Sequence, residues 1–366
     1  MRRARYFVLV LASCAGASPL VGCGNAQHSS DPEVAGTAGV AGLTNAAGAV
    51  ATGGGGPNTA GTGPQVLASA QNYPVAIAVD GTDVYWVNQG VAEVSKVPIG
   101  GGKVTTLYSE AAISAGVGIA LDATSVYWTM NFQERGSGSL AKIGKGGGSP
   151  VLLATDEPRL AGVAVDDANA YWTSGFSPDT QAKLNSVPID GGTPTALLTT
   201  SFTNLIAVDA TDVYWPTRHA GNGENCIMKM PKHGGPQMQV GCYRDEPFGL
   251  ALDATDVYWT SNNSGSSDGG FHPVGTILKV SKNGGTPIIL ASDQFQPRAI
   301  AIDDESVFWS NHNDVDGSLL KVSKNGGTPV VLASGQAPYI FAIAVDETSI
   351  YWANAQPGVI MKLTPK

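Results

Sequence analysis

Seven segments of this chain share one pattern of apolar and polar positions. Each segment reads apolar-Ala-apolar-Asp, continues through a few turn residues and ends with an aromatic residue followed by Trp. The seven copies are IAVDGTDVYW, IALDATSVYW, VAVDDANAYW, IAVDATDVYW, LALDATDVYW, IAIDDESVFW and IAVDETSIYW. Every tryptophan lies in one of them: Trp86, Trp128, Trp172, Trp215, Trp259, Trp309 and Trp352. Repeats of about 40–50 residues are typical of propellers, solenoids and other arrays.

The pattern between successive copies predicts four β-strands in each repeat. In the sixth repeat the expected strands include residues 300–302, 307–309, 320–322 and 330–333. Their alternation and their β-branched and aromatic residues favour strands. Gly-Gly pairs separate the third strand from the fourth, where a hairpin turn needs positive φ. Four-stranded units at this period predict the blades of an all-β propeller.

An alanine stands two residues before the repeat aspartate in every copy. Strand geometry with a period of two places these small side chains on one face of the strand. We expect this strand to lie near the propeller axis, where the small face makes room for the large Tyr-Trp surface of the next blade. The seven alanines are Ala78, Ala120, Ala164, Ala207, Ala251, Ala301 and Ala344.

The two ends of the repeat region predict how the ring closes. The seventh copy is followed by a third strand at residues 360–363 but by no fourth strand. The segment PQVLAS at residues 64–69 precedes the first copy and closely matches PVVLAS at residues 329–334. We therefore expect the N-terminal strand to complete the last blade and to remove an exposed sheet edge. This arrangement predicts seven blades.

The Tyr-Trp motif and its period resemble the YWTD propellers of lipoprotein-receptor ectodomains and, more loosely, NHL-type propellers. The resemblance covers residues 64–366 and implies a β-propeller fold. YWTD propellers have six blades, so a six-bladed propeller is the alternative to the seven counted here. Because the blade number differs, the partner surface of that family is not carried over to this chain.

The N-terminal segment has the features of a bacterial lipoprotein signal. It begins MRRAR, continues with apolar residues and ends LVGC, which resembles the lipoprotein box. We expect residues 1–22 to be a signal peptide and Cys23 to carry the lipid. Cys14 is the alternative lipidated cysteine, and a secretory signal without lipid is the other interpretation. Several acyl chains on one residue would give stable membrane anchoring.

Residues 23–62 are rich in Gly, Ala, Ser and Thr and contain little that could form a core. We expect a flexible tether with a random-coil reach of about 35 Å. The propeller domain would then span residues 63–366. Signal, tether and propeller together resemble exported bacterial propeller lipoproteins, which are anchored in the envelope on the periplasmic side or at the cell surface.

The charge balance argues against nucleic acid as a partner. The chain has 21 Lys and Arg against 30 Asp and Glu, and removal of residues 1–22 would also remove Arg2, Arg3 and Arg5. The mature net charge would be −12. Binding to phosphate backbones needs clustered Lys and Arg.

Cys226 and Cys242 are expected to form a disulfide. An even pair of cysteines in an exported domain indicates one disulfide. Both residues lie eight positions from Gly234, in the third and fourth strands of one repeat. An odd-length turn or a bulge would place them opposite each other, within bridging distance.

The loop between the second and third strands carries the insertions. From the Trp to the Lys or Ser of the third strand the spacing is 10, 14, 14, 14, 20, 12 and 10 residues, whereas the repeat Asp and Trp are always six apart. Variable loops on a rigid scaffold commonly carry function. We therefore expect the binding face at this end, with the candidate residues Arg159, Arg218, His219, Glu224, Phe248, His272, Arg298, His312 and Tyr339.

The repeat aspartates are interpreted as turn residues, because Asp readily accepts hydrogen bonds from turn amides. They are Asp80, Asp122, Asp166, Asp209, Asp253, Asp303 and Asp346. A calcium site near Asp314 and Asp316 is an alternative, although the segment lacks the spacing and terminal Glu of an EF-hand loop. The sequence contains no zinc motif, nucleophile elbow, P-loop or dinucleotide fingerprint. We therefore expect no metal or cofactor.

These features favour a membrane-tethered, extracytoplasmic and monomeric module that binds a protein or a glycan without catalysis. One alternative is a hydrolase or lyase with its site at the channel mouth, using residues such as His219, Glu224, His272 and His312. The other is a structural component of the cell envelope. Fold alone does not decide among these roles.

Overall fold

The computed structural model describes residues 8–9, 63–110, 115–132, 137–175, 182–200, 204–220, 224–262, 274–312 and 316–366. The expected lipidation site Cys23, its alternative Cys14 and the whole of the predicted tether at residues 23–62 lie outside these ranges. Of the predicted signal peptide, only residues 8–9 are described. The described residues form no α-helix, and among them no helix is long and apolar enough to cross a membrane.

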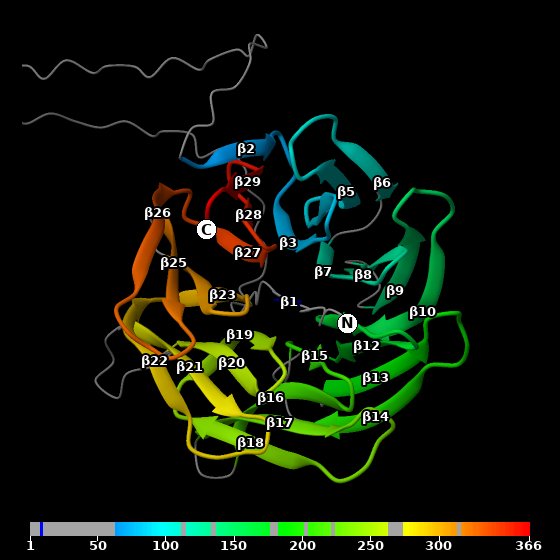
Figure 1. Ribbon diagram of the computed structural model, residues 1–366. Helices are drawn as coiled ribbons and strands as arrows, with labels where there is room; N and C mark the ends of the chain where they lie inside the picture. Colours follow the sequence, from blue (N-terminus) through cyan, green and yellow to red (C-terminus); the bar gives the residue numbers. More distant parts are fainter. Residues whose placement is uncertain are drawn as a thin grey trace, which may run out of the picture. The chain divides into compact units, whose positions relative to one another are not determined.

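Seven antiparallel sheets form the four-stranded blades of a β-propeller, and β1 adds a fifth strand to one of these sheets near the centre of the ring (Figure 1). Blade 1 contains β3 (Pro74–Val79), β4 (Asp83–Asn88), β5 (Ala92–Pro98) and β6 (Thr105–Glu110). Blade 2 contains β7 (Ala115–Leu121), β8 (Ser125–Asn131), β9 (Ser137–Gly144) and β10 (Val151–Pro158). Blade 3 contains β11 (Val163–Val165), β12 (Asn169–Ser174), β13 (Ala182–Pro188) and β14 (Thr195–Thr200). The predicted all-β, seven-bladed propeller is confirmed.

The remaining blades repeat this order of strands. Blade 4 contains β15 (Ala207–Val208), β16 (Asp212–Ala220), β17 (Glu224–Pro231) and β18 (Met238–Tyr243). Blade 5 contains β19 (Glu246–Leu252), β20 (Asp256–Asn262), β21 (Val274–Ser281) and β22 (Ile288–Phe295). Blade 6 contains β23 (Pro297–Ile302), β24 (Ser306–Asn311), β25 (Gly317–Ser323) and β26 (Val330–Gln336). The short strand β1 (Val8–Leu9) pairs with β19 at the inner edge of blade 5.

Blade 7 closes the ring in the predicted way. It contains β27 (Ile340–Val345), β28 (Ile350–Asn354) and β29 (Val359–Leu363), and its fourth strand is β2 (Gln65–Ala68) from the other end of the chain. Val66 pairs with Met361, and Ala68 pairs with Ile360. Because β2 covers the edge of β29, the last blade has the same four strands as the others.

The turns have the backbone geometry that their residues predict. Gly326 and Gly327 have φ values of 84° and 128°, and the Gly-Gly pairs of the other five described turns of this kind also have positive φ. In the first-to-second-strand turn of blade 1, Asp80 Oδ1 accepts hydrogen bonds from the backbone N–H groups of Thr82 and Asp83 at 2.8 and 2.9 Å. The equivalent aspartate accepts the same pair in each of the other six blades, which confirms the turn role.

The repeated aromatic residues form the contacts between neighbouring blades. All seven repeat tryptophans are fully buried. Ala78 lies directly across from Tyr85 of its own blade, so the small and the aromatic side chain share a face. Tyr85 belongs to the same hydrophobic cluster as Trp128 of blade 2. The expected Tyr-Trp surface is therefore divided: the Tyr comes from the alanine's own blade, and the next blade supplies the Trp.

Candidate functional site

The central channel has two ends with different loops. The turns between the first and second strands and those between the third and fourth strands meet at one end. In blade 2 the N–H of Lys145 donates to the carbonyl of Thr124 at 2.8 Å, and in blade 1 the N–H of Ile99 donates to the carbonyl of Thr82 at 2.9 Å. We name this end the turn face. The second-to-third strand loops and the connections between blades lie at the opposite end, which we name the loop face. The predicted separation of short turns from variable loops is confirmed.

A ring of residues at the start of the inner strands forms the channel mouth on the loop face. Each ring residue lies five positions before the repeat aspartate, as Phe248 and Arg298 do. The ring consists of Val75, Val117, Ala161, Asn204, Phe248, Arg298 and Phe341. Its aromatic and cationic members come from blades 5, 6 and 7, so one side of the mouth differs chemically from the rest.

The guanidinium of Arg298 lies close to the aromatic side chains of two other channel-mouth residues, Phe248 and Phe341. Its guanidinium carbon is 5.7 Å from the centre of the Phe248 ring and 5.5 Å from that of Phe341. Both distances are within the range of cation–π attraction. The carbonyl of Arg298 accepts a hydrogen bond from Thr260 Oγ1 at 2.6 Å, which fixes the strand to the neighbouring blade. The planar guanidinium is therefore held half-buried in a defined place.

Further aromatic side chains surround Phe341. Its ring centre is 5.9 Å from that of Tyr339, 6.2 Å from that of His312 and 6.0 Å from that of Tyr73. His312 and Tyr339 are themselves 5.2 Å apart. We name Tyr73, Phe248, Arg298, His312, Tyr339 and Phe341 the rim cluster. The structure thus brings together four of the predicted binding residues: Phe248, Arg298, His312 and Tyr339.

The blade connections hold the rim cluster in place. The carbonyl of Tyr339 accepts a hydrogen bond from the N–H of Ala355 at 3.0 Å, and that of Tyr73 accepts from Gln89 at 2.9 Å. Tyr73 also has a positive φ of 61°. Non-glycine residues adopt this conformation at a cost and often do so at functional sites, where the surrounding structure enforces it.

Phe341 was absent from the residues that the sequence singled out for this site, whereas Tyr73 was expected there as part of a connection between blades. Phe341 has the same spacing from its repeat aspartate as Phe248 and Arg298, so applying that offset to all seven repeats would have identified it. Tyr73 lies directly before β3, as Tyr339 lies directly before β27, and the folded ring makes the first and last blades neighbours.

Two buried acidic residues lie close to the rim cluster in sequence, at the start of β19. Asp245 and Glu246 are each 8% exposed. Burial raises the pKa of Asp245, and the attraction of Arg244, whose Nε is 3.6 Å from the carboxylate, opposes that shift. A carboxyl group with a raised pKa near a channel mouth is a candidate for acid–base chemistry.

Of the other predicted binding residues, those whose side chains the structure describes do not join the rim cluster. Arg159 and Glu224 are exposed on other blades, and Arg159 has a positive φ of 34°. Arg218 and His219 belong to β16, but their side chains lie outside the described part of the chain, as does all of His272. Asp314 is also outside it, and Asp316 is exposed. Within the described ranges no group of three or more His, Cys, Asp or Glu side chains is placed to hold a metal ion.

The predicted disulfide between Cys226 and Cys242 is present. The two residues face each other directly in the pairing of β17 with β18. A bulge between Ile227 and Met228 shifts the register by one residue, which is the condition that the sequence spacing required. The disulfide therefore joins the two outer strands of blade 4.

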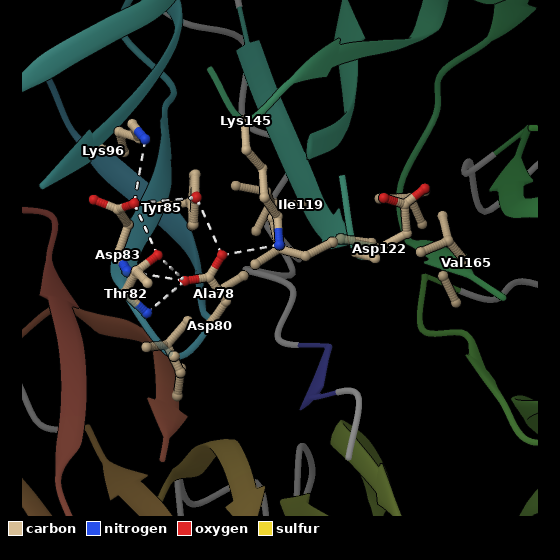
Figure 2. Close-up of a pocket in the computed structure, with 18 of the residues that line it drawn as sticks. Ala78, Asp80, Thr82, Asp83, Tyr85, Lys96, Ile119, Asp122, Lys145 and Val165 are labelled. Carbon is tan, nitrogen blue, oxygen red and sulfur yellow. Dashed lines mark hydrogen bonds and ion pairs between the residues drawn. The ribbon is translucent and has the colours of Figure 1, made fainter. Parts of the chain in front are cut away.

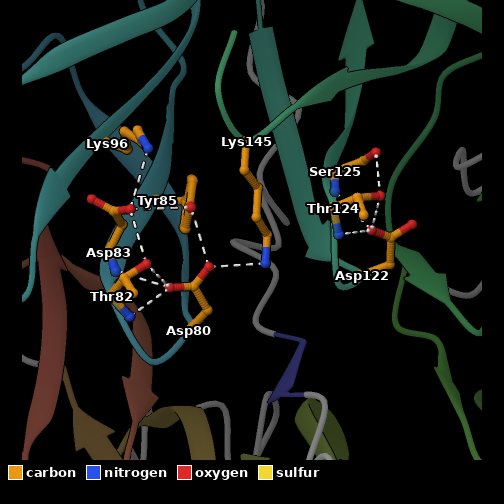
Figure 3. Close-up of polar contacts among 9 residues, drawn as sticks. All are labelled: Asp80, Thr82, Asp83, Tyr85, Lys96, Asp122, Thr124, Ser125 and Lys145. Atoms are coloured by element: carbon orange, nitrogen blue, oxygen red, sulfur yellow. Dashed lines mark hydrogen bonds and ion pairs between the residues drawn. The ribbon is translucent and has the colours of Figure 1, made fainter.

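On the turn face, ion pairs join neighbouring blades (Figure 3). Lys145 Nζ in blade 2 lies 2.9 Å from Asp80 Oδ2 in blade 1, and the hydroxyl of Tyr85 donates to the same oxygen at 3.1 Å. We name this lysine–aspartate contact the latch. It recurs for Lys232 with Asp166, Lys282 with Asp209, Lys324 with Asp253 and Lys366 with Asp303, at 2.5, 2.7, 2.7 and 2.9 Å. The sequence interpretation recognised the aspartates as turn residues but missed the lysines, four of which precede a Gly-Gly turn.

At two interfaces isoleucine takes the place of the latch lysine. Ile189 of blade 3 occupies the lysine position next to Asp122 of blade 2, and Ile99 of blade 1 occupies it next to Asp346 of blade 7. The carbonyl of Ile99 accepts a hydrogen bond from Lys362 Nζ at 2.9 Å, and that of Ile189 accepts one from Lys142 Nζ. Neither Asp122 nor Asp346 has an ion pair with any residue that the structure describes.

The latch keeps its carboxylates charged. Burial by itself would raise the pKa of Asp209, but hydrogen bonds from Lys282 and from the amides of Asp212 and Thr211 lower it to about 2. The pKa of Asp80 is also held well below its ordinary value, because Lys145 and turn amides outweigh burial. Burial and the adjacent carboxylate raise the pKa of Tyr85. These groups therefore stay in their ordinary charge states at neutral pH, which suits a structural role.

A cavity of about 710 Å³ lies at the turn-face end of the channel (Figure 2). Its lining includes Asp80, Asp122, Lys145 and the ends of inner strands from several blades. The sequence predicted the binding face at the other end of the channel and gave no indication of this cavity. The two ends therefore offer two separate surfaces, the rim cluster on the loop face and the cavity on the turn face.

Comparison with known proteins supports the fold. No protein-family model matches the chain, and no curated protein matches its sequence. A chain in the crystal structure of a nidogen/laminin complex is similar, with a TM-score of 0.54, 16% identity, and coverage of 72% of this chain and 98% of that one. It is a YWTD-type propeller, so the resemblance inferred from the Tyr-Trp motif holds at the level of the fold.

Propellers with other roles are equally similar. The computationally designed Ika8 protein has a TM-score of 0.55 and 12% identity over 82% of this chain and 98% of its own. An oligogalacturonate lyase in complex with manganese has a TM-score of 0.52 and 13% identity over 67% of this chain and 74% of its own. At such low identities the likeness shows the fold alone, and the role has to be argued from the site.

Proposed function

We propose that this protein is a non-catalytic binding module that recognises a protein or a glycan through its loop face. The observation that carries the proposal is the rim cluster, in which the Arg298 guanidinium lies 5.7 and 5.5 Å from two phenylalanine ring centres. Aromatic residues and arginine are the residue types that most often dominate binding energy at protein interfaces. Aromatic rings also offer flat apolar faces with polar edges nearby, which suits a sugar ring.

The way in which the cluster is built supports recognition. Its side chains come from three blades and from the connections before β3 and β27, and backbone hydrogen bonds fix those connections. A preorganised surface loses less conformational entropy on binding than a mobile one. His312 and Phe341 are buried, whereas Tyr73, Phe248, Arg298 and Tyr339 are half-buried. A protein would cover these four side chains, and a glycan would stack on one or two of their rings.

The proposal places this module outside the cytoplasm on a membrane. Residues 1–22 would direct export, Cys23 would carry the lipid, and residues 23–62 would hold the propeller away from the membrane surface. The mass of the intact protein after extraction from membranes tests this part. Acylation at Cys23 is the expected result, and a mature protein that begins elsewhere without lipid would contradict it.

A variant series tests the role of the rim cluster. Arg298→Gln and Phe341→Ala are expected to weaken capture of the partner from an envelope extract, or of a glycan from a defined panel, by about tenfold or more, as loss of an interface hot spot does. Arg159→Gln is the matched control, because Arg159 is an exposed arginine on the same face outside the cluster. Thermal unfolding of every variant separates loss of binding from loss of fold. Equal capture by Arg298→Gln, Phe341→Ala and Arg159→Gln would exclude the cluster as the binding surface.

A hydrolase or lyase at the channel mouth is the second candidate, and the buried Asp245 with its raised pKa is the observation in its favour. Such an enzyme would lose activity in Asp245→Asn while still binding its substrate. If the protein neither binds nor turns over any envelope component or glycan, a structural role in the envelope is favoured instead.

A further inference from the structure

The cavity on the turn face is built mainly from the inner strands of five blades. It is lined by Ala78, Val79, Ile119, Ala120, Leu121, Val163, Ala164, Val165, Ile206, Ala207, Val208, Ala344 and Val345. Five of the seven repeat alanines are among these residues. Small side chains on the channel wall leave the volume of about 710 Å³ open, and the wall is apolar. Cavities of this size and lining are typical of sites for small organic ligands.

The lining of this cavity also contains charged residues (Figure 2). Asp80, Asp83, Asp122, Lys96 and Lys145 all belong to its lining. Lys145 pairs with Asp80 at 2.9 Å, and Lys96 pairs with Asp83 at 3.2 Å. Two of the three carboxylates therefore have a cation of their own, which leaves Asp122 as the negative charge that the lining does not compensate.

Asp122 has neutral hydrogen-bond donors around it but forms no ion pair with any residue that the structure describes. Its carboxylate accepts hydrogen bonds from the N–H groups of Thr124 and Ser125 at 2.6 and 2.7 Å (Figure 3). It also accepts one from the hydroxyl of Tyr127 at 2.7 Å. The lysine that would latch it is replaced by Ile189, and Lys142 donates to the carbonyl of Ile189 instead. Although burial opposes ionisation, these hydrogen bonds lower the pKa of Asp122, so the group is a carboxylate at neutral pH.

The latch in the other blades shows what this carboxylate is built to accept. In five blades the equivalent aspartate makes the same turn hydrogen bonds and receives the ammonium group of a lysine at 2.5–2.9 Å. Asp346 also lacks that lysine, but it is not part of the cavity lining. Asp122 is thus distinguished from the other repeat aspartates by two features together, the missing lysine and the adjacent cavity.

We propose that this cavity binds a small organic cation, a primary amine or guanidinium compound with an apolar body. Its charged group would pair with Asp122 in place of the missing lysine, and its apolar body would lie against the alanine-lined wall. A charge-assisted hydrogen bond to a half-buried carboxylate is stronger than one between neutral groups. The site lies on the turn face and is independent of the rim cluster on the loop face.

Calorimetric titration of the purified protein with three amines of increasing apolar size tests the ligand class. The probes are hexylamine, 2-phenylethylamine and tryptamine, and the matched neutral and anionic probes are 2-phenylethanol and 3-phenylpropionate. We expect saturable binding of at least one amine with one site per chain, and binding about tenfold or more weaker for the neutral and anionic probes. Absence of binding by all three amines at millimolar concentration would overturn the proposal.

Two pairs of variants locate the site. Asp122→Asn is expected to weaken amine binding by about tenfold or more, whereas Asp346→Asn, which loses the equivalent turn carboxylate outside the lining, is expected to leave it unchanged. Ile189→Lys places a latch lysine beside Asp122 and should abolish amine binding. Ile99→Lys places one beside Asp346, outside the cavity lining, and should leave amine binding unchanged.

The second pair keeps the test decisive if Asp122→Asn fails to fold, because adding a latch lysine follows a pattern that five blades already use. Thermal unfolding of all four variants checks their folding. If Ile189→Lys binds the amine as tightly as Ile99→Lys, Asp122 is not the counter-ion and the proposal is wrong.

Discussion

Lys145 Nζ lies 2.9 Å from Asp80 Oδ2, and this contact joins the third-to-fourth-strand turn of one blade to the first-to-second-strand turn of the blade before it. The Lys145 ammonium is also 5.7 Å from the centre of the Tyr85 ring, which stabilises the same cation. Since equivalent pairs occur at five interfaces, the turn face of the ring is held together by links between successive blades.

Removal of one latch lysine should weaken the fold. Lys145→Met leaves the half-buried Asp80 without its cation, and we expect the free energy of unfolding to fall by about 1 kcal/mol, the upper range for exposed pairs. Chemical denaturation measures this difference. Lys103→Met is the control, because Lys103 is an exposed lysine of the neighbouring turn. Equal stability of the two variants would show that the latch contributes nothing measurable.

The latch also predicts how stability depends on pH. The pKa of Asp209 is lowered to about 2 in the folded protein, below the value of about 3.9 in an unfolded chain. The stabilisation is therefore complete above about pH 4 and is lost as the pH falls towards 2. Thermal unfolding between pH 2 and pH 7 should show a decline that begins near pH 4. Lys282→Met, which removes the partner of Asp209, should show a smaller decline over that range, and an unchanged slope would contradict this account.

The ring-closing strand predicts the effect of N-terminal truncation. A chain that begins at residue 63 keeps β2, whereas one that begins at residue 70 lacks it and exposes the edge of β29. We expect the shorter chain to unfold at lower temperature and to self-associate, because an unpaired strand edge favours intermolecular pairing. Thermal unfolding and size-exclusion chromatography measure both effects. A monomeric shorter chain with unchanged thermal stability would show that β2 is dispensable.

The disulfide should stabilise blade 4 by constraining the unfolded chain. Cys226 and Cys242 are 16 residues apart, and closing a loop of that length corresponds to about 3 kcal/mol in the chain-entropy description. A reductant should therefore lower the midpoint of denaturation of the wild-type protein. The double variant Cys226→Ala, Cys242→Ala is the control and should not respond to the reductant. If the wild type does not respond either, although its thiols become free, the disulfide contributes little.

Those parts of the fold that depend on short-range chemistry were predictable from the sequence. The turn aspartates and the Gly-Gly pairs have local backbone requirements, so each of them indicates its turn without knowledge of the rest. The match between residues 64–69 and 329–334 identified the closing strand because equivalent strands in a repeat have equivalent neighbours. The disulfide was expected from the equal spacing of Cys226 and Cys242 from Gly234, on condition of an odd-length turn or a bulge, and the structure shows the bulge.

The features that the sequence did not reveal depend on contacts between blades. The distance between Lys145 and Asp80 is set by blade packing, so the lysine could be recognised only by its recurrence before the glycines. Phe341 meets Arg298 because inner strands converge on the axis, and the sequence offered only the shared offset from the repeat aspartate. The cavity is a property of the space between five inner strands, which no single repeat encodes.

The closure of blade 7 has a consequence for how the protein would respond to mechanical load. Tension carried by the segment before residue 63 enters the propeller through β2, whose four residues pair with β29 at three positions. The other three strands of blade 7 are joined to one another along the chain, whereas β2 is held to them only by that pairing. Pulling on the N-terminal segment would therefore detach β2 and open the ring while the other six blades keep all their strands, so the closing strand is the mechanical breakpoint of the propeller.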